Sequence, residues 1–187
     1  SFVFGHLGPP RLEKGVDTLL NAISLFLECN PKANVRFLVQ WNTEVLKSNG
    51  EKLTPNQKLY DDGRVSFISQ KLNSEEYESS LQEIDCMVLP YRKAAYASRI
   101  SGIAVEAVTS GQCLIVPKNT WLSDLLDECG HGISIVDGDA NELSSALYEI
   151  FRNRQEMTEI ARKRASIAQI IHSNETFIKT LWGQNPE

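Results

Sequence analysis

Short apolar runs alternate with amphipathic helical patterns along most of this chain. The spacing of the apolar positions changes from every second residue to about 3.6 residues and back, as expected for strands separated by helices. Strands are expected at residues 2–5, 35–39, 65–68, 87–90, 113–117 and 132–136. Helices are expected along an apolar stripe from Val16 to Leu27 and at residues 74–84, 101–110, 121–128, 141–151, 154–171 and 173–181. This order predicts an α/β domain of three layers, with about six parallel strands, helices on both faces and extra C-terminal helices.

Residues 41–63 are the least regular part of the chain. We expect a surface loop there, with one helix near residues 56–60. Two helix starts carry clear capping signals. Asn73 precedes Ser-Glu-Glu, and Asp139 is followed three residues later by Glu142, which predicts a capping box.

Composition places the chain among soluble single domains. Its 187 residues are 42% hydrophobic, enough for one full core. A net charge of -5 argues against a nucleic-acid partner, which needs a basic face. The apolar run at residues 22–27 is far shorter than the roughly 20 residues of a membrane span, so a cytoplasmic protein is expected.

Cysteines and acidic residues show no metal-ligand spacing. The four cysteines are scattered and form no C-x-x-C pair, so neither a disulfide framework nor a zinc site is expected. No D-x-D lies between apolar strands. The sequence therefore predicts neither a metal nor another cofactor.

The turn after the first expected strand, GHLGPPRLEKG, carries Arg11 and Lys14 into the start of a helix. Two cations there oppose the helix dipole, so local stability does not explain them, whereas a bound diphosphate would. The alternative is a pair of solvated charges, with Lys14 paired to Glu13 or Asp17. The turn matches neither the dinucleotide fingerprint G-x-G-x-x-G nor a P-loop.

A second candidate region, YASRISGIAVEAVTSGQCLIVP, contains a short helix that opens at Ser101 and Gly102 and leads into a strand. Backbone N–H groups at a bare helix start bind anions, and Glu106, one turn later, is placed to accept hydrogen bonds from hydroxyls. His6, after the first strand, is a candidate donor to a phosphate or sugar oxygen, although filling a turn is an equal alternative. Trp121 either lines the same crevice or packs in the core.

Taken together, these segments resemble a known domain. FGHLG, R-x-x-K-G, VSFIS, DCMVLPY, SGIAVEAVTSGQCLIVP and GHGISIVDGDANELSSAL occur in the order of the C-terminal, donor-binding domain of GT-B glycosyltransferases, in the retaining, family-4-like group 1. The resemblance covers nearly the whole chain and implies a Rossmann-like domain at 1–187. It implies that Arg11 and Lys14 hold the diphosphate and stabilise its departure, that Glu106 binds the ribose, and that Ser101 and Gly102 let backbone N–H groups approach phosphate or sugar.

The sequence departs from the family pattern at one position. The first glutamate of the family's Glu, seven residues, Glu signature falls at Ser98, which alters the pocket for the donor sugar. The form seen here, with Tyr96 and Arg99 before Ser101-Gly102, resembles a subset of these enzymes that lack that acid.

The resemblance implies a cytoplasmic transferase of polysaccharide biosynthesis that moves a hexose from a nucleoside-diphosphate sugar to a glycan or lipid-linked acceptor. The acceptor would lie on an N-terminal domain absent from this sequence, so the fragment alone is expected to bind without turnover. Membrane association would come only through that absent part. Two alternatives stay open: a nucleotide-sugar epimerase on the same scaffold, and a non-catalytic homologue.

Overall fold

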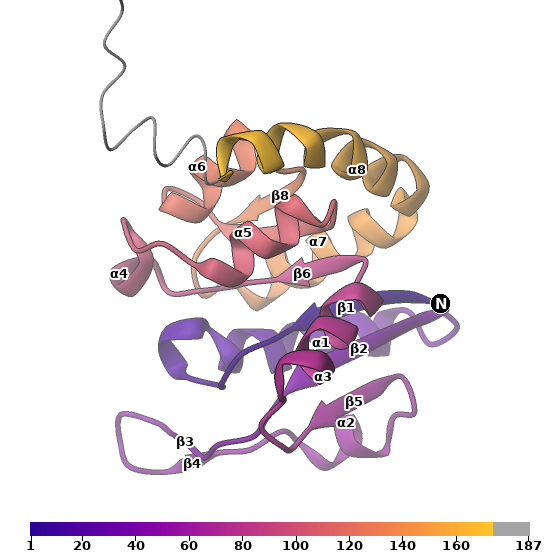
Figure 1. The fold of residues 1–187 in the computed structure, drawn as a ribbon. Helices are drawn as coiled ribbons and strands as arrows, with labels where there is room; N and C mark the ends of the chain where they lie inside the picture. The colour runs from indigo at the N-terminus through magenta and orange to yellow at the C-terminus, as the bar shows by residue number, and fades with distance from the viewer. Residues whose placement is uncertain (174–187) are drawn as a thin grey trace, which may run out of the picture.

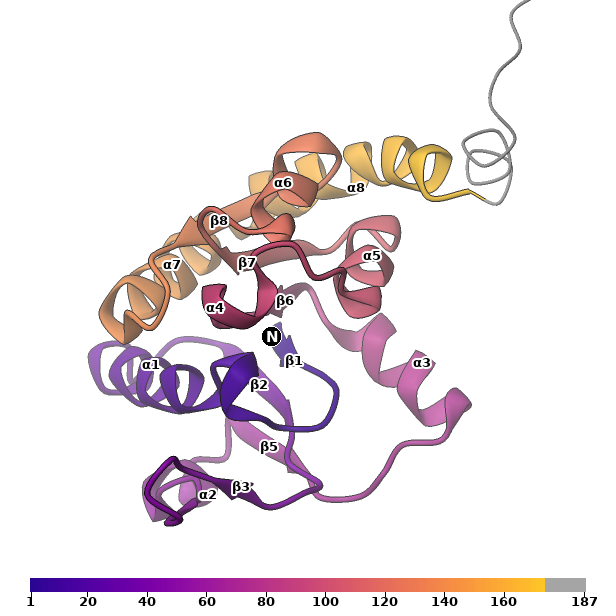
Figure 2. The same cartoon turned by 90° about the vertical axis from the view of Figure 1, so that its left-hand side faces the viewer.

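Six strands form one parallel sheet at the centre of the protein. The structure is a computed structural model, and it describes residues 1–173. The sheet has the order β5-β2-β1-β6-β7-β8; Figure 1 labels its strands except β7, which Figure 2 labels between β6 and β8. Its strands are β1 (Phe2–His6), β2 (Val35–Gln40), β5 (Val65–Ile68), β6 (Cys86–Val88), β7 (Cys113–Pro117) and β8 (Gly132–Ile135). The expected parallel α/β architecture is therefore confirmed.

Helices cover both faces of this sheet. They are η1 (Leu12–Lys14), α1 (Val16–Cys29), α2 (Gln57–Asp61), α3 (Ser74–Glu83), α4 (Lys93–Tyr96), α5 (Gly102–Thr109), α6 (Trp121–Glu128), α7 (Ala140–Arg152) and α8 (Arg154–Ile171). In Figure 2, α1 and α7 lie on one side of the sheet, and α3 and α5 lie on the other. Among residues 1–173, no helix combines the length and the apolar composition needed to cross a bilayer.

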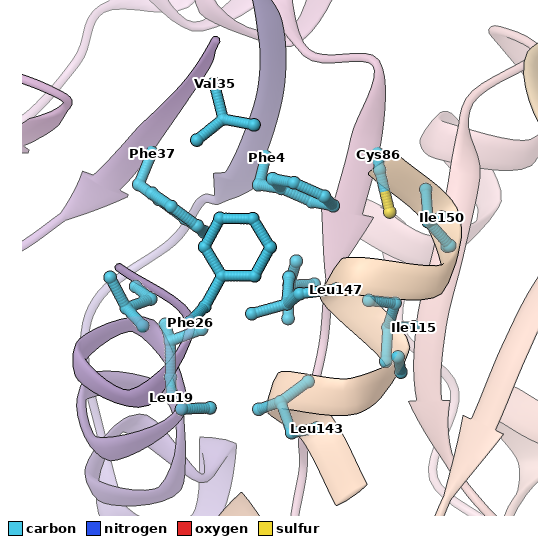
Figure 3. Close-up of a cluster of buried hydrophobic side chains, with 14 of the residues drawn as sticks. Phe4, Leu19, Phe26, Val35, Phe37, Cys86, Ile115, Leu143, Leu147 and Ile150 are labelled. Carbon is cyan, nitrogen blue, oxygen red and sulfur yellow. The ribbon is translucent and has the colours of Figure 1, made fainter. Parts of the chain in front are cut away.

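Neighbouring residues of each strand pack into hydrophobic cores on opposite faces of the sheet, because successive side chains in a strand point to opposite faces. Phe4 packs with Phe26 and Phe37 between the sheet and helices α1 and α7 (Figure 3). The rings of Phe4 and Phe37 stack with centroids 5.3 Å apart. Val3, one residue before Phe4, belongs instead to the core under α5 and α6. A sheet buried on both faces explains why its strands are continuous apolar runs.

The expected elements agree closely with the observed ones. The strands at 65–68 and 113–117 and the helices at 121–128 and 154–171 have the expected bounds. The strand expected at 87–90 begins and ends earlier, at Cys86–Val88. The helix expected at 173–181 lies almost entirely outside the described residues.

Three short elements were not expected. Residues 41–56 contain a hairpin of β3 (Val45–Leu46) and β4 (Lys52–Leu53) rather than a plain loop. Two residues per strand are too few to show a period in the sequence. The turns η1 and α4 were missed for the same reason.

The two helix starts with capping signals have different outcomes, and the first forms a complete capping box. Asn73 Oδ1 accepts from the Glu76 N–H, and Glu76 Oε2 accepts from the Asn73 N–H, both at 2.9 Å. Asp139 caps α7 as expected, but the box with Glu142 is wrong in its second half. The Glu142 carboxylate accepts from the Val136 N–H at 2.8 Å and pairs with a lysine instead of closing back on Asp139.

The central strands β1 and β6 define where a ligand crevice belongs. From β1 the chain runs outward through β2 to β5, and from β6 it runs outward in the other direction through β7 to β8. The loops that leave the carboxyl ends of β1 and β6 therefore diverge. In open α/β sheets such a point of divergence is where ligands bind. These ends lie toward the left of Figure 1 and toward the viewer in Figure 2.

Candidate functional site: a cationic pocket between β1 and β6

A pocket of about 230 Å³ lies at this point of divergence. Its lining comes from the turn after β1 and from the segment between β6 and α5. The lining residues are Arg11, Lys14, Tyr91, Tyr96, Arg99, Ile100, Ser101, Gly102 and Ile103. Four of the residues singled out in the sequence, Arg11, Lys14, Ser101 and Gly102, thus lie in one pocket, although about 90 residues separate the two pairs along the chain.

Gly15 fixes the turn that carries Lys14. Its φ of 66° is left-handed, and a Cβ at this position would lie 1.8 Å from the carbonyl oxygen of Pro90. Only glycine fits so close to the loop after β6. The Arg92 N–H donates to the Glu13 carbonyl at 2.8 Å, which ties the same two segments together. The two walls of the pocket are therefore joined through backbone contacts.

The Arg92 side chain strengthens this joint. Its guanidinium pairs with Asp17 in the first turn of α1 at 2.6 Å and with Asp137 in the loop after β8 at 3.4 Å. The first turn of α1 and two loops at the carboxyl edge are thereby held around one half-buried cation. Asp17 is engaged here, so it does not neutralise Lys14 as one alternative supposed.

Lys14 is a buried cation without an anionic partner. Its side chain is 8% exposed, and within the described residues it makes neither a hydrogen bond nor an ion pair. Its Nζ lies 5.8 Å from the ring centroid of Tyr91. Burial lowers the pKa of Lys14, the nearby Arg11 and Arg99 lower it further, and the Glu13 carboxylate opposes this only in part by raising it. A buried charge is costly unless an opposite charge accompanies it, so this site favours an anion.

Arg11 and Arg99 flank the pocket at its exposed side. The Nη1 atoms of both lie near one oxygen of Glu13, at 3.4 Å from Arg11 and 3.3 Å from Arg99. Glu13 therefore pairs with the two arginines rather than with Lys14. The Arg99 guanidinium also lies over the ring of Tyr96, 4.9 Å from its centroid.

The start of α5 forms the third side of the pocket. Ser101 is the N-cap residue, and no side chain within residues 1–173 caps the helix there. The first N–H groups of a helix have no intrahelical partners, so this end attracts anions. The Ser101 side chain shares a hydrogen bond with Tyr91. A Cβ at Gly102 would meet nothing within 4 Å, so glycine here leaves the helix tip open rather than relieving a clash.

Glu106 lies one turn further along α5, about 6 Å from Gly102 along the helix axis. It is exposed and does not line the pocket itself. Its Oε2 accepts a hydrogen bond of 2.5 Å from the hydroxyl of Tyr77, on α3. Burial and this hydrogen bond raise the pKa of Tyr77. Tyr77 was not noticed in the sequence, because its contact with Glu106 exists only where α3 and α5 come together.

His6 lies beneath the pocket rather than in it. It is 1% exposed, and its Nδ1 donates to the Val88 carbonyl at 2.8 Å. Burial lowers its pKa to about 4, so the ring is neutral at pH 7. In that state Nε2 carries no proton to donate to a phosphate, and it has no partner among the described residues.

The remaining candidates lie outside the pocket lining. Ser98 is exposed on the loop between α4 and α5. Trp121 is half-buried against the core under α5 and α6, and its backbone N–H donates to the Ala97 carbonyl at 2.9 Å. Within the part of the chain that the structure describes, no three His, Cys, Asp or Glu side chains gather as metal ligands.

A larger hollow, of about 800 Å³, lies at the opposite edge of the sheet. Phe2, Asp85, Arg154 and Lys163 are among the residues that line it, and none of the residues singled out in the sequence does. Its three cations, Arg154, Arg162 and Lys163, are exposed to solvent, and two of them are engaged, since Lys163 pairs with Glu159 and Arg154 donates to a backbone carbonyl. The smaller pocket has the unpaired lysine and is therefore the candidate site.

Comparison with known proteins shows similarity in structure but not in sequence. No family model and no curated protein matches the chain. Among solved structures, the C-terminal domain of the group 1 glycosyl transferase LpcC from Francisella tularensis has a TM-score of 0.69 and 16% identity, over 92% of this chain and 87% of that one. HepE from Anabaena, solved with UDP, has a TM-score of 0.69 and 18% identity. Sucrose-phosphate synthase from Thermosynechococcus elongatus has a TM-score of 0.71 and 17% identity.

The extent of these matches shows how much of the larger proteins is shared. The match to HepE covers 97% of this chain and 49% of HepE, and the match to the synthase covers 97% and 44%. This chain thus spans about half the length of either protein, while it spans most of the isolated LpcC domain. The chain has the fold of the C-terminal domain of GT-B glycosyltransferases, as its sequence motifs predicted.

Proposed function

We propose that this chain is the nucleotide-sugar-binding domain of a glycosyltransferase, whose complete form transfers a hexose from a nucleoside-diphosphate sugar to a glycan or glycolipid acceptor. The observation that carries the proposal is the meeting of Arg11, the unpaired Lys14 and the uncapped start of α5 in one pocket at the divergence of β1 and β6. A diphosphate supplies the negative charge that this pocket lacks.

Different residues of the site bind different parts of the nucleotide-sugar donor. Lys14, Arg11 and the N–H groups of α5 hold the diphosphate, and they stabilise the charge that develops on it as the bond to the sugar breaks. Glu106, one turn beyond, accepts hydrogen bonds from the ribose hydroxyls, with Tyr77 fixing one carboxylate oxygen and leaving the other free. These positive groups take the part that a metal ion plays in other transferases, so binding needs no divalent cation.

Proteins of the same fold support a nucleoside diphosphate as the ligand. HepE from Anabaena was solved with UDP, with UDP and glucose, and with UDP-glucose. TarM from S. aureus, with a TM-score of 0.70, was solved with UDP. The proposal extends this ligand class to the present pocket, and it assigns the acceptor to an N-terminal domain outside this sequence.

One observation favours a second candidate, a homologue that binds without catalysing transfer. Ser98 offers a single exposed hydroxyl where the family pattern has a carboxylate. A hydroxyl holds a sugar less firmly than a charged acceptor does, because hydrogen bonds to charged groups are stronger. In this candidate the diphosphate pocket stays intact and transfer is lost.

Calorimetric titration of the 187-residue chain with UDP, GDP, ADP and uridine tests the proposal. We expect a nucleoside diphosphate to bind far more tightly than uridine, with no change when EDTA is added. Equal binding of uridine and UDP, or no binding of any diphosphate, would contradict it. Product analysis on the full-length protein then separates the alternatives: sugar transfer supports the transferase, isomerised donor the epimerase, and unchanged donor the non-catalytic homologue.

A further inference from the structure

Glu13 occupies an unusual place among the pocket's charges. Its Oε1 atom lies 3.4 Å from Arg11 Nη1 and 3.3 Å from Arg99 Nη1, so one carboxylate oxygen bridges two cations from opposite walls of the pocket. Arg11 comes from the turn after β1, and Arg99 comes from the loop before α5. A bridge of this kind occupies the guanidinium groups that an incoming anion would use.

Arg99 is held at the pocket by more than this bridge. Tyr91 and Tyr96 pack against each other with ring centroids 4.3 Å apart. Lys14 lies over the first ring, at 5.8 Å, and Arg99 lies over the second, at 4.9 Å. Both tyrosines are buried, at 1% and 4% exposure, so they form a fixed floor. Cation–π contacts thus keep both cations beside the same space.

We propose that Arg99 is a third cationic ligand of the pocket and that Glu13 is an internal counter-ion, which a bound diphosphate displaces. The inference rests on the proposed diphosphate site and adds to it the residue that regulates its affinity. The side chains of Arg11, Arg99 and Glu13 are 57%, 53% and 36% exposed. Ion pairs this exposed contribute little, so a more highly charged anion replaces Glu13 readily.

Displacing the Glu13 carboxylate costs free energy when an anion binds to the wild-type protein. A diphosphate that contacts both arginines brings its oxygens close to the Glu13 carboxylate, and like charges at such distances repel. Either the carboxylate moves away, which breaks both pairs, or it stays and opposes the ligand. In both cases Glu13 weakens binding, and its removal strengthens binding.

Titration of Glu13→Gln with inorganic pyrophosphate and with UDP tests the first half of the proposal. Glutamine keeps the size of the side chain and removes its charge. We expect both ligands to bind about two- to tenfold more tightly than to the wild type, the range for the loss of two exposed ion pairs. The gain should shrink as salt is added, because exposed charges are screened.

Glu83→Gln is the matched control. Glu83 also forms an exposed ion pair with an arginine, Arg36, but at the opposite edge of the sheet. Its replacement by glutamine changes the net charge by the same amount. Its affinity for pyrophosphate should equal that of the wild type. If Glu13→Gln binds no more tightly than this control, Glu13 is not a counter-ion of the site and the proposal fails.

Arg99→Ala, made in the wild type and in the Glu13→Gln protein, tests the second half. If Arg99 only neutralises Glu13, its removal has no effect once Glu13 is uncharged. If Arg99 binds the anion, its removal from the Glu13→Gln protein weakens pyrophosphate binding by about tenfold, the range for a charge-assisted hydrogen bond. An unchanged affinity in that background would overturn the assignment of Arg99.

The two ligands separate this inference from the proposed function. Tighter pyrophosphate binding by Glu13→Gln, with UDP no better than pyrophosphate, would uphold the counter-ion and contradict the nucleotide site. Tight UDP binding that neither substitution changes would uphold the nucleotide site and contradict the counter-ion.

Discussion

Replacing Lys14 by methionine should stabilise the free protein and impair the pocket at the same time. Lys14 is 8% exposed, has no hydrogen-bonding or ion-pair partner within residues 1–173, and is repelled by Arg11 and Arg99, an effect that attraction to Glu13 offsets only in part. Methionine fills a similar volume without the charge. Replacing buried charges by apolar groups often stabilises a protein by about 1–4 kcal/mol, and we expect about 1–2 kcal/mol for this incompletely buried lysine.

The same substitution removes one charge-assisted contact to a diphosphate. Such contacts contribute about 1.5–3 kcal/mol, which corresponds to about a 10- to 150-fold loss of UDP affinity. Urea unfolding measures the first effect, and calorimetric titration with UDP measures the second. A given concentration of UDP should raise the unfolding midpoint of Lys14→Met less than that of the wild type, because the stabilisation grows with the ratio of ligand concentration to Kd.

Lys58→Met provides the comparison. This lysine is 87% exposed and lies 3.7 Å from Glu28, so its loss should change stability by less than about 0.5 kcal/mol and leave binding unchanged. The reasoning is refuted if Lys14→Met is less stable than the wild type, since Lys14 would then have a favourable partner. It is equally refuted if Lys14→Met binds UDP as tightly as Lys58→Met does.

Three further predictions concern the surroundings of the pocket. Gly15→Ala should lower the free energy of unfolding, measured with urea, by about 3 kcal/mol or more, because of the left-handed φ and the clash with the Pro90 backbone. Gly50→Ala, also at a left-handed φ but in open space, should lower it by about 1 kcal/mol. Equal losses would contradict the close packing at Gly15. His6 has a pKa of about 4 when folded and about 6.5 when unfolded, so the unfolded state binds more protons between these values and stability falls as pH falls. Urea unfolding should show a loss of about 3 kcal/mol from pH 7 to pH 4 that is absent in His6→Asn, and the same loss in both proteins would exclude His6 as its source. Tyr77→Phe should weaken UDP binding by about two- to tenfold, because Glu106 loses one fixed hydrogen bond, and should leave pyrophosphate binding unchanged; a loss for both ligands would place Tyr77 elsewhere in the site.

The positions of the six sheet strands and most helix bounds could be predicted from the sequence because they depend on local spacing, whereas the order of the strands in the sheet came only from the structure. Continuous apolar runs marked the buried strands, and Asn73 with Glu76 marked the start of α3. The hairpin β3–β4 and the short helices η1 and α4 could not be predicted, since elements of two to four residues show no period in the sequence. Glu142 illustrates the same limit at a cap, because its carboxylate binds groups from two other loops.

For the candidate site, the sequence determined which residue types follow β1 and open α5. Arg11 and Lys14 were identifiable because two cations at a helix start oppose the helix dipole, and Gly102 because the bare start of a helix has free N–H groups; both features call for an anion.

Only the tertiary structure decided how these charges are paired. Within residues 1–173 Lys14 has no hydrogen-bonding or ion-pair partner, Glu13 bridges to Arg99 across 86 positions, and Tyr77 reaches Glu106 from another helix. Pairing depends on distances of a few ångströms between loops that the sheet brings together, and no local pattern encodes such distances. The chain's local chemistry therefore predicted an anion site, and the packing of β1 beside β6 determined which charged side chains meet at the pocket and how they pair.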